Sequence, residues 1–383
     1  PAAPSTAPCT STTASCPMPT SRGSERSAVR GGKAKDADRA EALAEAVRAA
    51  AADRRPLRIV GGDTRFFYGR AVEGEPLNLS DHRGVIDYEP SELVITARAG
   101  TPLAEVEALL DKNGQMLAFE PPSFGPAATL GGAVASGLSG PRRPFAGAVR
   151  DSLLGATILD GCGRRLRFGG TVFKNVAGFD AFRLQAGALG TLGVILDVSL
   201  RVAPKPRAEA SLAFETDWPA AQARVAALMR RPLPLSAAAH EGGRLYLRLS
   251  GPEAAVAAAR AELGGEDAPA GFWSSVRHMT HPALTADRLW RLSVPQGAHI
   301  DLPGRWLIDW GGAQRWLAAQ ASDAQVRAAA EAARGHATLF HAEGPAEQPF
   351  APLPEPMMAL HRRLKAAFDP EGVLNPGRMY AGL

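Results

Sequence analysis

Three glycine-rich loops carry the residues best suited to binding chemistry in this sequence. They are "IVGGDTRFFYGR" at 59–70, "ATLGGAVASGLSGPRRPFAGAVRD" at 128–151 and "LQAGALGTLGVI" at 184–195. Glycine permits positive φ and a close approach of the backbone, and successive backbone amides in such turns bind anions. One loop of this kind is more often only a turn. Three of them in one α/β segment predict a long, phosphate-bearing ligand that is contacted at several points.

Two common nucleotide-binding motifs are missing from the sequence. A phosphate-binding P-loop needs GxxxxGK followed by Ser or Thr, and no stretch has it. The dinucleotide-binding motif needs GxGxxG between a strand and a helix. Here Gly187, Gly190 and Gly193 recur at every third residue and lead into a strand, which is the opposite order. The ligand is therefore expected to bind in another way.

The histidines and cysteines do not form a recognisable reactive site. His278 and His281 form an HxxH, and His336 lies five residues before His341, but neither pair has the carboxylates of a metal site. Oxidation of a 2-hydroxy acid needs a base and a cation. A scattered pair, such as His341 with Arg378, stays open. We assign no catalytic residue and predict no metal site.

The cysteine count and the charge exclude several classes of protein. Three cysteines, Cys9, Cys16 and Cys162, match no zinc, iron–sulfur or disulfide pattern, and they favour a reducing cytoplasm. The net charge is +4, but residues 1–35 hold five basic residues and one acid, so the remainder is close to neutral. Nucleic-acid binding is not expected, because it needs a basic surface on the folded part. No apolar run is long enough for a transmembrane helix.

The chain divides into two strand-and-helix blocks. We expect a disordered tail at 1–35, a first domain at 36–205 and a second at 206–383, with the boundary in "APKPR". Helices are predicted at 36–53, 101–114 and 251–265, the second with Thr101 as its cap and Pro102 at its first position. Strands are predicted at 56–62, 91–100, 153–160, 166–169, 193–202 and 243–251. The last should be half-buried, with its leucines on one face.

Several motifs resemble one family of flavoproteins. The three loops, in this order, look like the FAD-binding domain of the p-cresol methylhydroxylase and vanillyl-alcohol oxidase class. The segment "FDPEGVLNPGRMY", 368–380, resembles the end of FAD-linked oxidases of this class. "HRGVIDYEPSELVITARAGTPL", "GQMLAFEPP", "GLSGPRRPFAGAVRD", "LRFGGTVFKNVAGFD" and "LIDWGGAQRW" resemble the E subunits of bacterial glycolate oxidases. The resemblance runs from about residue 36 to 383.

The resemblance implies an α+β fold, with a two-part FAD-binding domain of the p-cresol methylhydroxylase type and a smaller α+β cap domain. The C-terminal segment then returns to the flavin. In the first loop, Asp63, Thr64 and Arg65 stand where some relatives carry more glycine or a histidine bonded to the flavin, so non-covalent FAD is expected. The implied cofactor-binding residues are Gly61, Gly62, Asp63, Thr64, Arg65, Gly69, Pro121, Thr129, Gly131, Gly132, Ser136, Gly137, Arg150, Asp151, Asp180, Gly187, Gly190, Thr191, Gly193, Val194, Ile195 and Asn375.

Two further motifs have two interpretations each. Arg142 and Arg143 either reach a pyrophosphate or are simply solvated. Four of the six tryptophans of the second domain either belong to its core or, through "GRWLIDWGG", form a partner-contact surface. These tryptophans are Trp290, Trp306, Trp310 and Trp316.

The resemblance implies an FAD-binding subunit of a glycolate oxidase complex, which oxidises glycolate to glyoxylate. The subunit would serve electron transfer or assembly beside a catalytic FAD subunit and an iron–sulfur subunit, in the cytoplasm or at the membrane surface through the complex. Two alternatives remain open. The first is a self-sufficient FAD-dependent 2-hydroxy-acid oxidoreductase, and the second is a flavin-free structural subunit.

Overall fold

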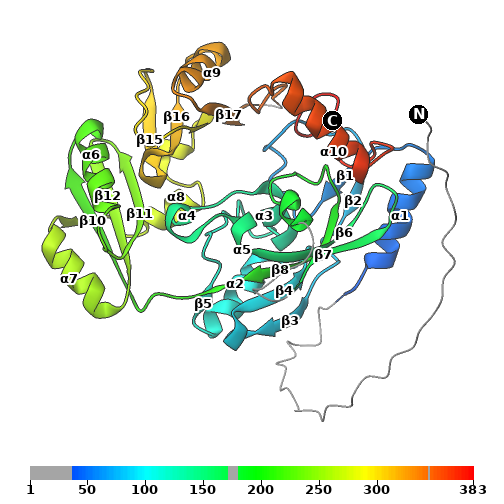
Figure 1. Ribbon diagram of the computed structural model, residues 1–383, viewed down its shortest axis with the longest axis horizontal. Coiled ribbons are helices and arrows are strands. Elements are labelled where there is room, and N and C mark those ends of the chain that lie inside the picture. The colour runs from blue at the N-terminus through cyan, green and yellow to red at the C-terminus, as the bar shows by residue number, and fades with distance from the viewer. Residues whose placement is uncertain (1–36, 171–179, 344–345) are drawn as a thin grey trace, which may run out of the picture.

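The computed structural model describes residues 37–170, 180–343 and 346–383, and each half of the chain is built around one sheet (Figure 1). The first sheet has five strands in the order β3-β4-β8-β6-β7. The second has eight, in the order β13-β10-β12-β11-β15-β16-β14-β17. The strand pairs of both sheets are antiparallel. The predicted α+β class is confirmed, whereas the tail predicted at 1–35 lies outside the described residues.

The first half contains one five-stranded sheet, two short strand pairs and the helices that cover them. Its elements are α1 (Ala40–Ala52), β1 (Leu57–Val60), β2 (Glu75–Asn78), β3 (Val85–Glu89), β4 (Val94–Arg98), α2 (Leu103–Lys112), β5 (Gln115–Met116), α3 (Leu130–Ser136), α4 (Arg143–Ala146), α5 (Val149–Ser152), β6 (Leu153–Leu159), β7 (Arg165–Gly169), β8 (Val194–Arg201) and β9 (Ala203–Pro204). The central strand β8 pairs with β4 and β6, and six of its residues are fully buried or nearly so because helices cover the sheet.

The second half begins after β9, which still pairs with β5 of the first half. Its elements are β10 (Ala208–Glu215), α6 (Trp218–Leu228), β11 (Leu235–Glu241), β12 (Arg244–Gly251), α7 (Glu253–Leu263), β13 (Glu266–Asp267), α8 (Phe272–Arg277), β14 (Leu289–Ser293), β15 (Arg305–Asp309), the 3-10 helix η4 (Trp310–Gly312), β16 (Gln314–Ala318), α9 (Asp323–Ala332), β17 (His336–His341) and α10 (Glu355–Phe368). Strands β11 and β15 join the two parts of the sheet through only two residue pairs.

Two sequence predictions about local structure were wrong. Helix α2 begins at Leu103 and its N-cap is Pro102, not Thr101. The Thr101 hydroxyl instead accepts a hydrogen bond from the Gly84 backbone at 2.9 Å, because the turn before β3 lies beside it. Strand β12 is buried on both faces, since its side chains Tyr246 and Arg248 are as inaccessible as its leucines. Its neighbours β10 and β11 place it in the interior of the sheet.

The tryptophans of the second half are interior side chains. Trp290 is fully buried, and Trp310 and Trp316 are nearly so. Trp306 is half-buried and its indole donates a hydrogen bond to the backbone oxygen of Leu302 at 3.1 Å. The alternative of a tryptophan-rich partner surface is therefore wrong, because the rings pack within the sheet and against neighbouring loops.

The C-terminal segment returns to the first half of the chain (Figure 1). After α10, the Leu57 amide donates to the Val373 oxygen at 2.7 Å, and the Asn375 amide donates to the Leu57 oxygen at 2.9 Å. Leu374 thus forms a parallel bridge beside β1. Residues more than three hundred positions apart therefore lie side by side at one edge of the first half.

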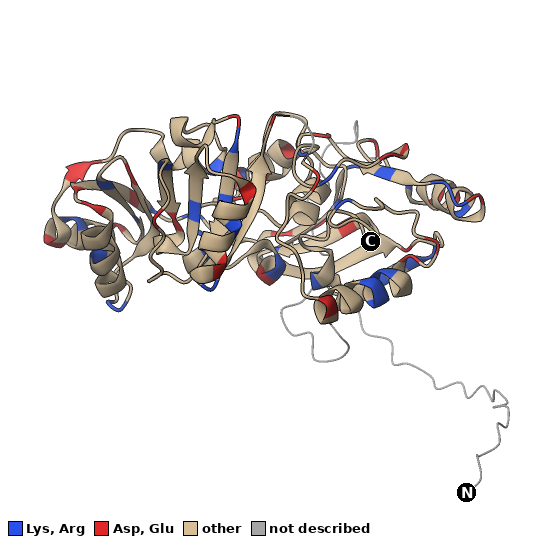
Figure 2. Cartoon of the chain, turned by 90° about the horizontal axis from the view of Figure 1, so that it is seen from above, with Lys and Arg blue, Asp and Glu red and all other residues tan. Residues whose placement is uncertain are grey.

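The charges are spread over the whole molecule. Figure 2 shows basic and acidic residues interspersed across both halves of the described chain. None of the helices in the described parts of the chain has the length and apolar character needed to cross a membrane.

Candidate functional site

A cavity of about 130 Å³ opens where the first and third glycine loops meet α3 and the C-terminal segment. Its walls come from the end of β1, the start of α3, the approach to β8 and the turn after α10. Thirteen of the predicted cofactor-binding residues line this cavity. They are Gly61, Gly62, Asp63, Thr64, Arg65, Thr129, Gly131, Gly132, Ser136, Gly190, Gly193, Ile195 and Asn375.

The other nine predicted residues do not line the cavity. Gly137 was expected to approach the ligand, but it ends α3 with φ 66°, and a Cβ there would lie 2.9 Å from the Cα of Gly187. These two glycines therefore pack against each other. The remaining seven are Gly69, Pro121, Arg150, Asp151, Asp180, Thr191 and Val194.

These seven have other contacts instead. Gly69 packs beneath the backbone of Arg378, and Val194 is in the core. The Asp151 carboxylate accepts a hydrogen bond from the Ala148 amide at 2.8 Å, and Arg150 lies beside Asp151 on the exposed side. Asp180 pairs with Arg183 at 3.0 Å. The Thr191 hydroxyl donates to the Ala188 oxygen, and the Pro121 oxygen accepts from Arg277.

The glycines that line the cavity are needed at close backbone contacts. A Cβ at Gly62 would lie 1.5 Å from the Ala127 oxygen, and one at Gly61 would lie 2.5 Å from Thr129 Oγ1. The first and second loops thus touch directly, as glycine alone permits. Gly132 differs, because its missing Cβ faces the Arg65 guanidinium at 3.3 Å. Of these three glycines, Gly132 is the one at which a side chain would meet the Arg65 guanidinium.

Arg65 is a half-buried cation without a carboxylate partner among the described residues. Its guanidinium donates to the Pro122 oxygen at 2.5 Å, and its Nε has no partner in the described structure. Burial lowers the pKa of Arg65 to about 10, which still leaves it charged at neutral pH. A buried guanidinium with free donors is suited to binding a phosphate or carboxylate. The site therefore has the positive charge that an anionic ligand requires.

A second arginine, Arg378, was missed as a binding residue by sequence reasoning. It lines the cavity, and its guanidinium donates to the backbone oxygens of Arg70 at 2.6 Å and of Arg65 and Phe66 at 3.1 Å. Burial lowers its pKa from the ordinary arginine value. Arg378 therefore holds the first loop in shape while adding positive charge. Arg58 and Phe66, which also line the cavity, carry no sequence signal beyond their places beside the first loop.

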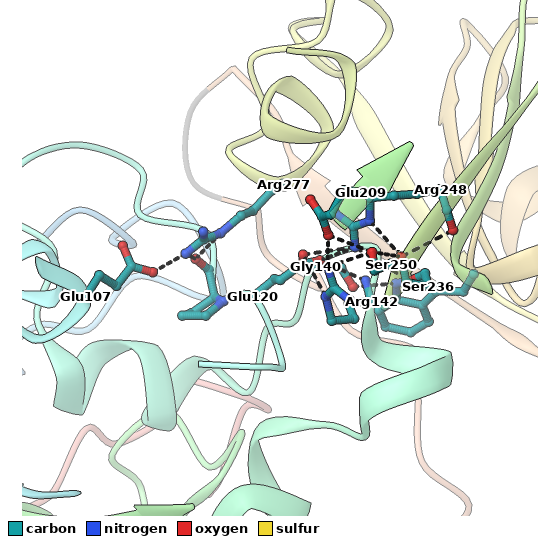
Figure 3. Close-up of polar contacts among 11 residues, drawn as sticks. Glu107, Glu120, Gly140, Arg142, Glu209, Ser236, Arg248, Ser250 and Arg277 are labelled. Atoms are coloured by element: carbon teal, nitrogen blue, oxygen red, sulfur yellow. Dashed lines mark hydrogen bonds and ion pairs between the residues drawn. The ribbon is translucent and has the colours of Figure 1, made fainter. Parts of the chain in front are cut away.

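A buried polar cluster joins the two halves beside the second loop (Figure 3). Glu120 accepts from Arg142 at 3.3 Å and from Arg248 at 2.9 Å, and Arg142 also contacts Glu209 at 2.6 Å. Burial alone would raise the pKa of Glu120, but the two arginines outweigh it and lower the pKa. The phosphate interpretation of Arg142 is therefore wrong, because its charge is already compensated inside the protein.

The neighbouring arginine has a different contact. The Arg143 guanidinium lies 4.3 Å from the ring centre of Trp310, in a cation–π arrangement. Neither interpretation from the sequence describes it, since it does not line the glycine-loop cavity and is not simply solvated. Sequence reasoning could not foresee this contact, because the ring comes from the other half of the chain.

A second cavity, of about 20 Å³, lies between the two halves. Arg291, Asp309, Gln314 and Ser139 contribute polar groups to it, and Trp316 is among the aromatic side chains that enclose it. Its volume corresponds to one or two water molecules, because one water needs roughly 10–15 Å³ of such space. Burial raises the pKa of Asp309 to about 7. A base and a cation thus face the same small cavity, which sequence reasoning missed.

No histidine of the described residues lines either cavity. His278 contacts the Ser123 hydroxyl at 3.1 Å, and His281 accepts from the Ala283 amide at 3.2 Å. His361 contacts the Met357 oxygen, and His341 packs edge-on against Phe67. Within the parts of the chain that the structure describes, no group of histidine, cysteine and carboxylate residues could hold a metal ion.

The chain matches two families along most of its length. Residues 36–169 match the "FAD binding domain" family, and residues 306–379 match "FAD linked oxidases, C-terminal domain". Alkyldihydroxyacetonephosphate synthase has a similar fold, with a TM-score of 0.61, 16% identity and coverage of 88% of this chain and 74% of that chain. The fold and the site thus define an FAD-linked oxidoreductase. The glycine loops, with Arg65 and Arg378, form its cavity in the half that matches the FAD binding domain.

Relatives define the family more closely. The chain is 48% identical over 351 residues to the "Glycolate oxidase subunit GlcE" of Escherichia coli (strain K12), which covers 91% of this chain and 99% of that protein. It is 28% identical to the "Glycolate oxidase subunit GlcD" of Bacillus subtilis (strain 168), over 38% of this chain and 31% of that protein. The chain belongs to the glycolate oxidase GlcE family, and its cofactor is non-covalent FAD.

Replacing Arg65 by methionine is expected to weaken FAD binding by about 10- to 100-fold, because a hydrogen bond to a charged group contributes about 1.5–3 kcal/mol. Methionine keeps the length of the side chain but removes the charge and the donors. Arg65→Lys should recover part of the affinity, since it restores the charge without the planar guanidinium. Titration of the flavin-free protein with FAD, followed by fluorescence, measures both. Unchanged binding by Arg65→Met would place the phosphates elsewhere.

Proposed function

We propose that this chain is the FAD-binding subunit of a glycolate oxidase complex and serves flavin electron transfer or assembly. Its partners are a catalytic flavoprotein subunit and an iron–sulfur subunit, and the complex oxidises glycolate to glyoxylate. Residues 36–205 bind FAD, and residues 206–383 form the cap domain and return to the flavin. The complex works in the cytoplasm, with peripheral contact to the membrane through its other subunits.

One observation carries this proposal. The similarity to the glycolate oxidase subunit of Escherichia coli spans nearly the full length of both proteins, which includes the cap as well as the FAD-binding half. The cavity supports the cofactor assignment, because Gly132 leaves space beside Arg65, whose Nε has no hydrogen-bond partner in the described structure. FAD, when bound, accepts and passes on electrons. Arg65 and Arg378 would hold its phosphates beside the glycine loops.

The rival function, a self-sufficient 2-hydroxy-acid oxidoreductase, has one observation in its favour. Asp309 could act as a base, and Arg291 could hold a carboxylate, since both face the small interdomain cavity. The volume of that cavity argues against this function. Glycolate has five non-hydrogen atoms, and a cavity of about 20 Å³ holds only one or two waters. A flavin-free scaffold is disfavoured because it would leave the Arg65 charge buried without an anion.

The test is a comparison of the isolated chain with the reconstituted complex. Under anaerobic conditions, glycolate should not bleach the flavin absorbance of the purified chain. Adding the catalytic and iron–sulfur subunits should give dye reduction by glycolate, and omitting this chain should weaken it. Bleaching of the isolated chain by glycolate or lactate would establish the self-sufficient enzyme instead. A chain that purifies without flavin and cannot be loaded with FAD would establish the scaffold.

A further inference from the structure

Helix α10 is attached to the protein in an unusual way. It has fourteen residues, and the only one that is buried is Lys365. Met357 and Leu360 remain largely exposed, although they are apolar. Most surface helices are held by an apolar stripe. Here the most deeply placed group of the helix is an ammonium.

The Lys365 ammonium has three hydrogen-bond acceptors, which matches its three donors. They are the Asp369 carboxylate at 2.6 Å, the Leu374 oxygen at 2.7 Å and the Thr191 oxygen at 2.9 Å. Burial lowers the pKa of Lys365, and the nearby Asp369 opposes this effect. The Asp369 carboxylate in turn accepts the amides of Val373 and Leu374 at 3.1 and 2.8 Å. All three hydrogen-bond donors of the ammonium thus have an acceptor, at Asp369, Leu374 and Thr191.

Two of these acceptors are next in sequence to residues of the FAD cavity. Thr191 follows Gly190, and Leu374 precedes Asn375. Gly190 and Asn375 both line the cavity and touch each other, since a Cβ at Gly190 would lie 2.8 Å from Asn375 Nδ2. Lys365 therefore donates hydrogen bonds to both chain segments that bring Gly190 and Asn375 together.

Asn375 extends the connection to the first glycine loop. Its side-chain oxygen accepts from the Ile59 amide at 2.7 Å, and its side-chain amide donates to the Leu189 oxygen at 2.6 Å. Its backbone has φ 43°, which few non-glycine residues adopt. Surrounding contacts must hold it in that conformation. The bond from Lys365 to the preceding carbonyl is one of those contacts.

We propose that Lys365 is a positioning residue for FAD: from outside the cavity, it holds Gly190 and Asn375 in the arrangement that receives the cofactor. The proposal rests on FAD binding in this cavity. Without the ammonium, the carbonyls of Thr191 and Leu374 lose a buried donor and Asp369 loses its counter-ion. The pair of cavity residues then separates, and affinity for FAD falls.

The test measures FAD binding and stability separately. Lys365→Met, Lys365→Arg and the double variant Lys365→Met with Asp369→Asn are compared with the wild-type protein. The double variant removes the unpaired buried carboxylate, so it folds even where the single variant does not. Arg362→Met is the matched control, because Arg362 is an exposed cation of the same helix that pairs only with Glu355. Titration gives the Kd for FAD, and melting is recorded with and without FAD.

We expect the Kd for FAD to rise about tenfold or more in Lys365→Met and in the double variant, with a smaller gain in melting temperature on adding FAD. Lys365→Arg keeps the charge and hydrogen-bond donors, so its Kd for FAD should stay much closer to that of the wild type. The Kd of the control Arg362→Met should equal the wild-type value. An equal fall in melting temperature with and without FAD, at unchanged Kd, would overturn the positioning role. Failure of the wild-type protein to bind FAD would overturn the cavity assignment as well.

Discussion

Replacing Gly132 by valine is expected to remove the flavin from this protein while leaving the fold in place. A Cβ at this position would lie 3.3 Å from Arg65 Nη1 and 3.2 Å from Thr129 Oγ1, so the two methyl groups of valine must occupy the cavity or displace the arginine. Either change removes space or charge from the site. FAD content should fall to about a tenth or less, which corresponds to a loss of at least 1.4 kcal/mol of binding free energy.

The structure changes the reason for this expectation. Gly132 lies within α3 and has no positive φ, so the effect of valine is steric and not a matter of backbone strain. The matched control is Gly297→Val, because no atom lies within 4 Å of a Cβ placed there and the residue is in the cap. Flavin absorbance per protein and melting of the flavin-free forms are the measurements. A Gly132→Val protein with a full flavin complement would show that FAD does not approach this face of α3.

Asp309 is expected to make the protein less stable as the pH rises through neutrality. Burial raises its folded-state pKa from 3.8 to about 7, with an additional contribution from Glu120 that Arg248 opposes. The folded protein therefore binds a proton that the unfolded chain has released. The stabilisation is complete below about pH 4 and is lost by about pH 7, and the full difference is on the order of 4 kcal/mol.

Asp309→Asn isolates this effect. Asparagine keeps an oxygen for the hydrogen bond from the Trp310 amide, which is 2.7 Å in the structure, but it cannot ionise. The difference in unfolding free energy between the variant and the wild type should therefore grow with pH between about pH 4 and pH 7 in favour of the variant, and level off above that. Denaturant unfolding at a series of pH values measures it. Asp301→Asn, at an exposed position, is the control and should show no such trend. A constant difference for Asp309→Asn would mean that Asp309 is ionised throughout.

Much of the site could be predicted from the sequence, because glycine at a close backbone contact leaves a local signal. Gly61, Gly62 and Gly132 were found through that signal, and all three line the cavity. The same signal gave a wrong prediction at Gly137 and Gly187. These glycines were expected to contact the ligand, but they pack against each other between two loops. Sequence spacing shows that a backbone must come near something, but it does not show whether that is a ligand or another loop.

The charged residues were harder to predict, since their roles depend on partners far away in the chain. Arg142 looked free beside Arg143, but its carboxylate partner Glu209 lies in the second half. Asp309 and Lys365 lie in segments with no sign of burial, and only the assembled fold shows that each is enclosed. The strands and helices that were predicted, by contrast, followed from local patterns, and the errors at Thr101 and β12 were limited to caps and burial.

The return of residues 373–375 to β1 also bears on how the protein is made. A ribosome releases the first half of the chain, with all three glycine loops, well before Asn375 is synthesised. Until then β1 lacks its neighbour Leu374, and the cavity lacks Asn375 and Arg378. The cavity is thus complete only after translation of nearly all described residues, including the entire second half.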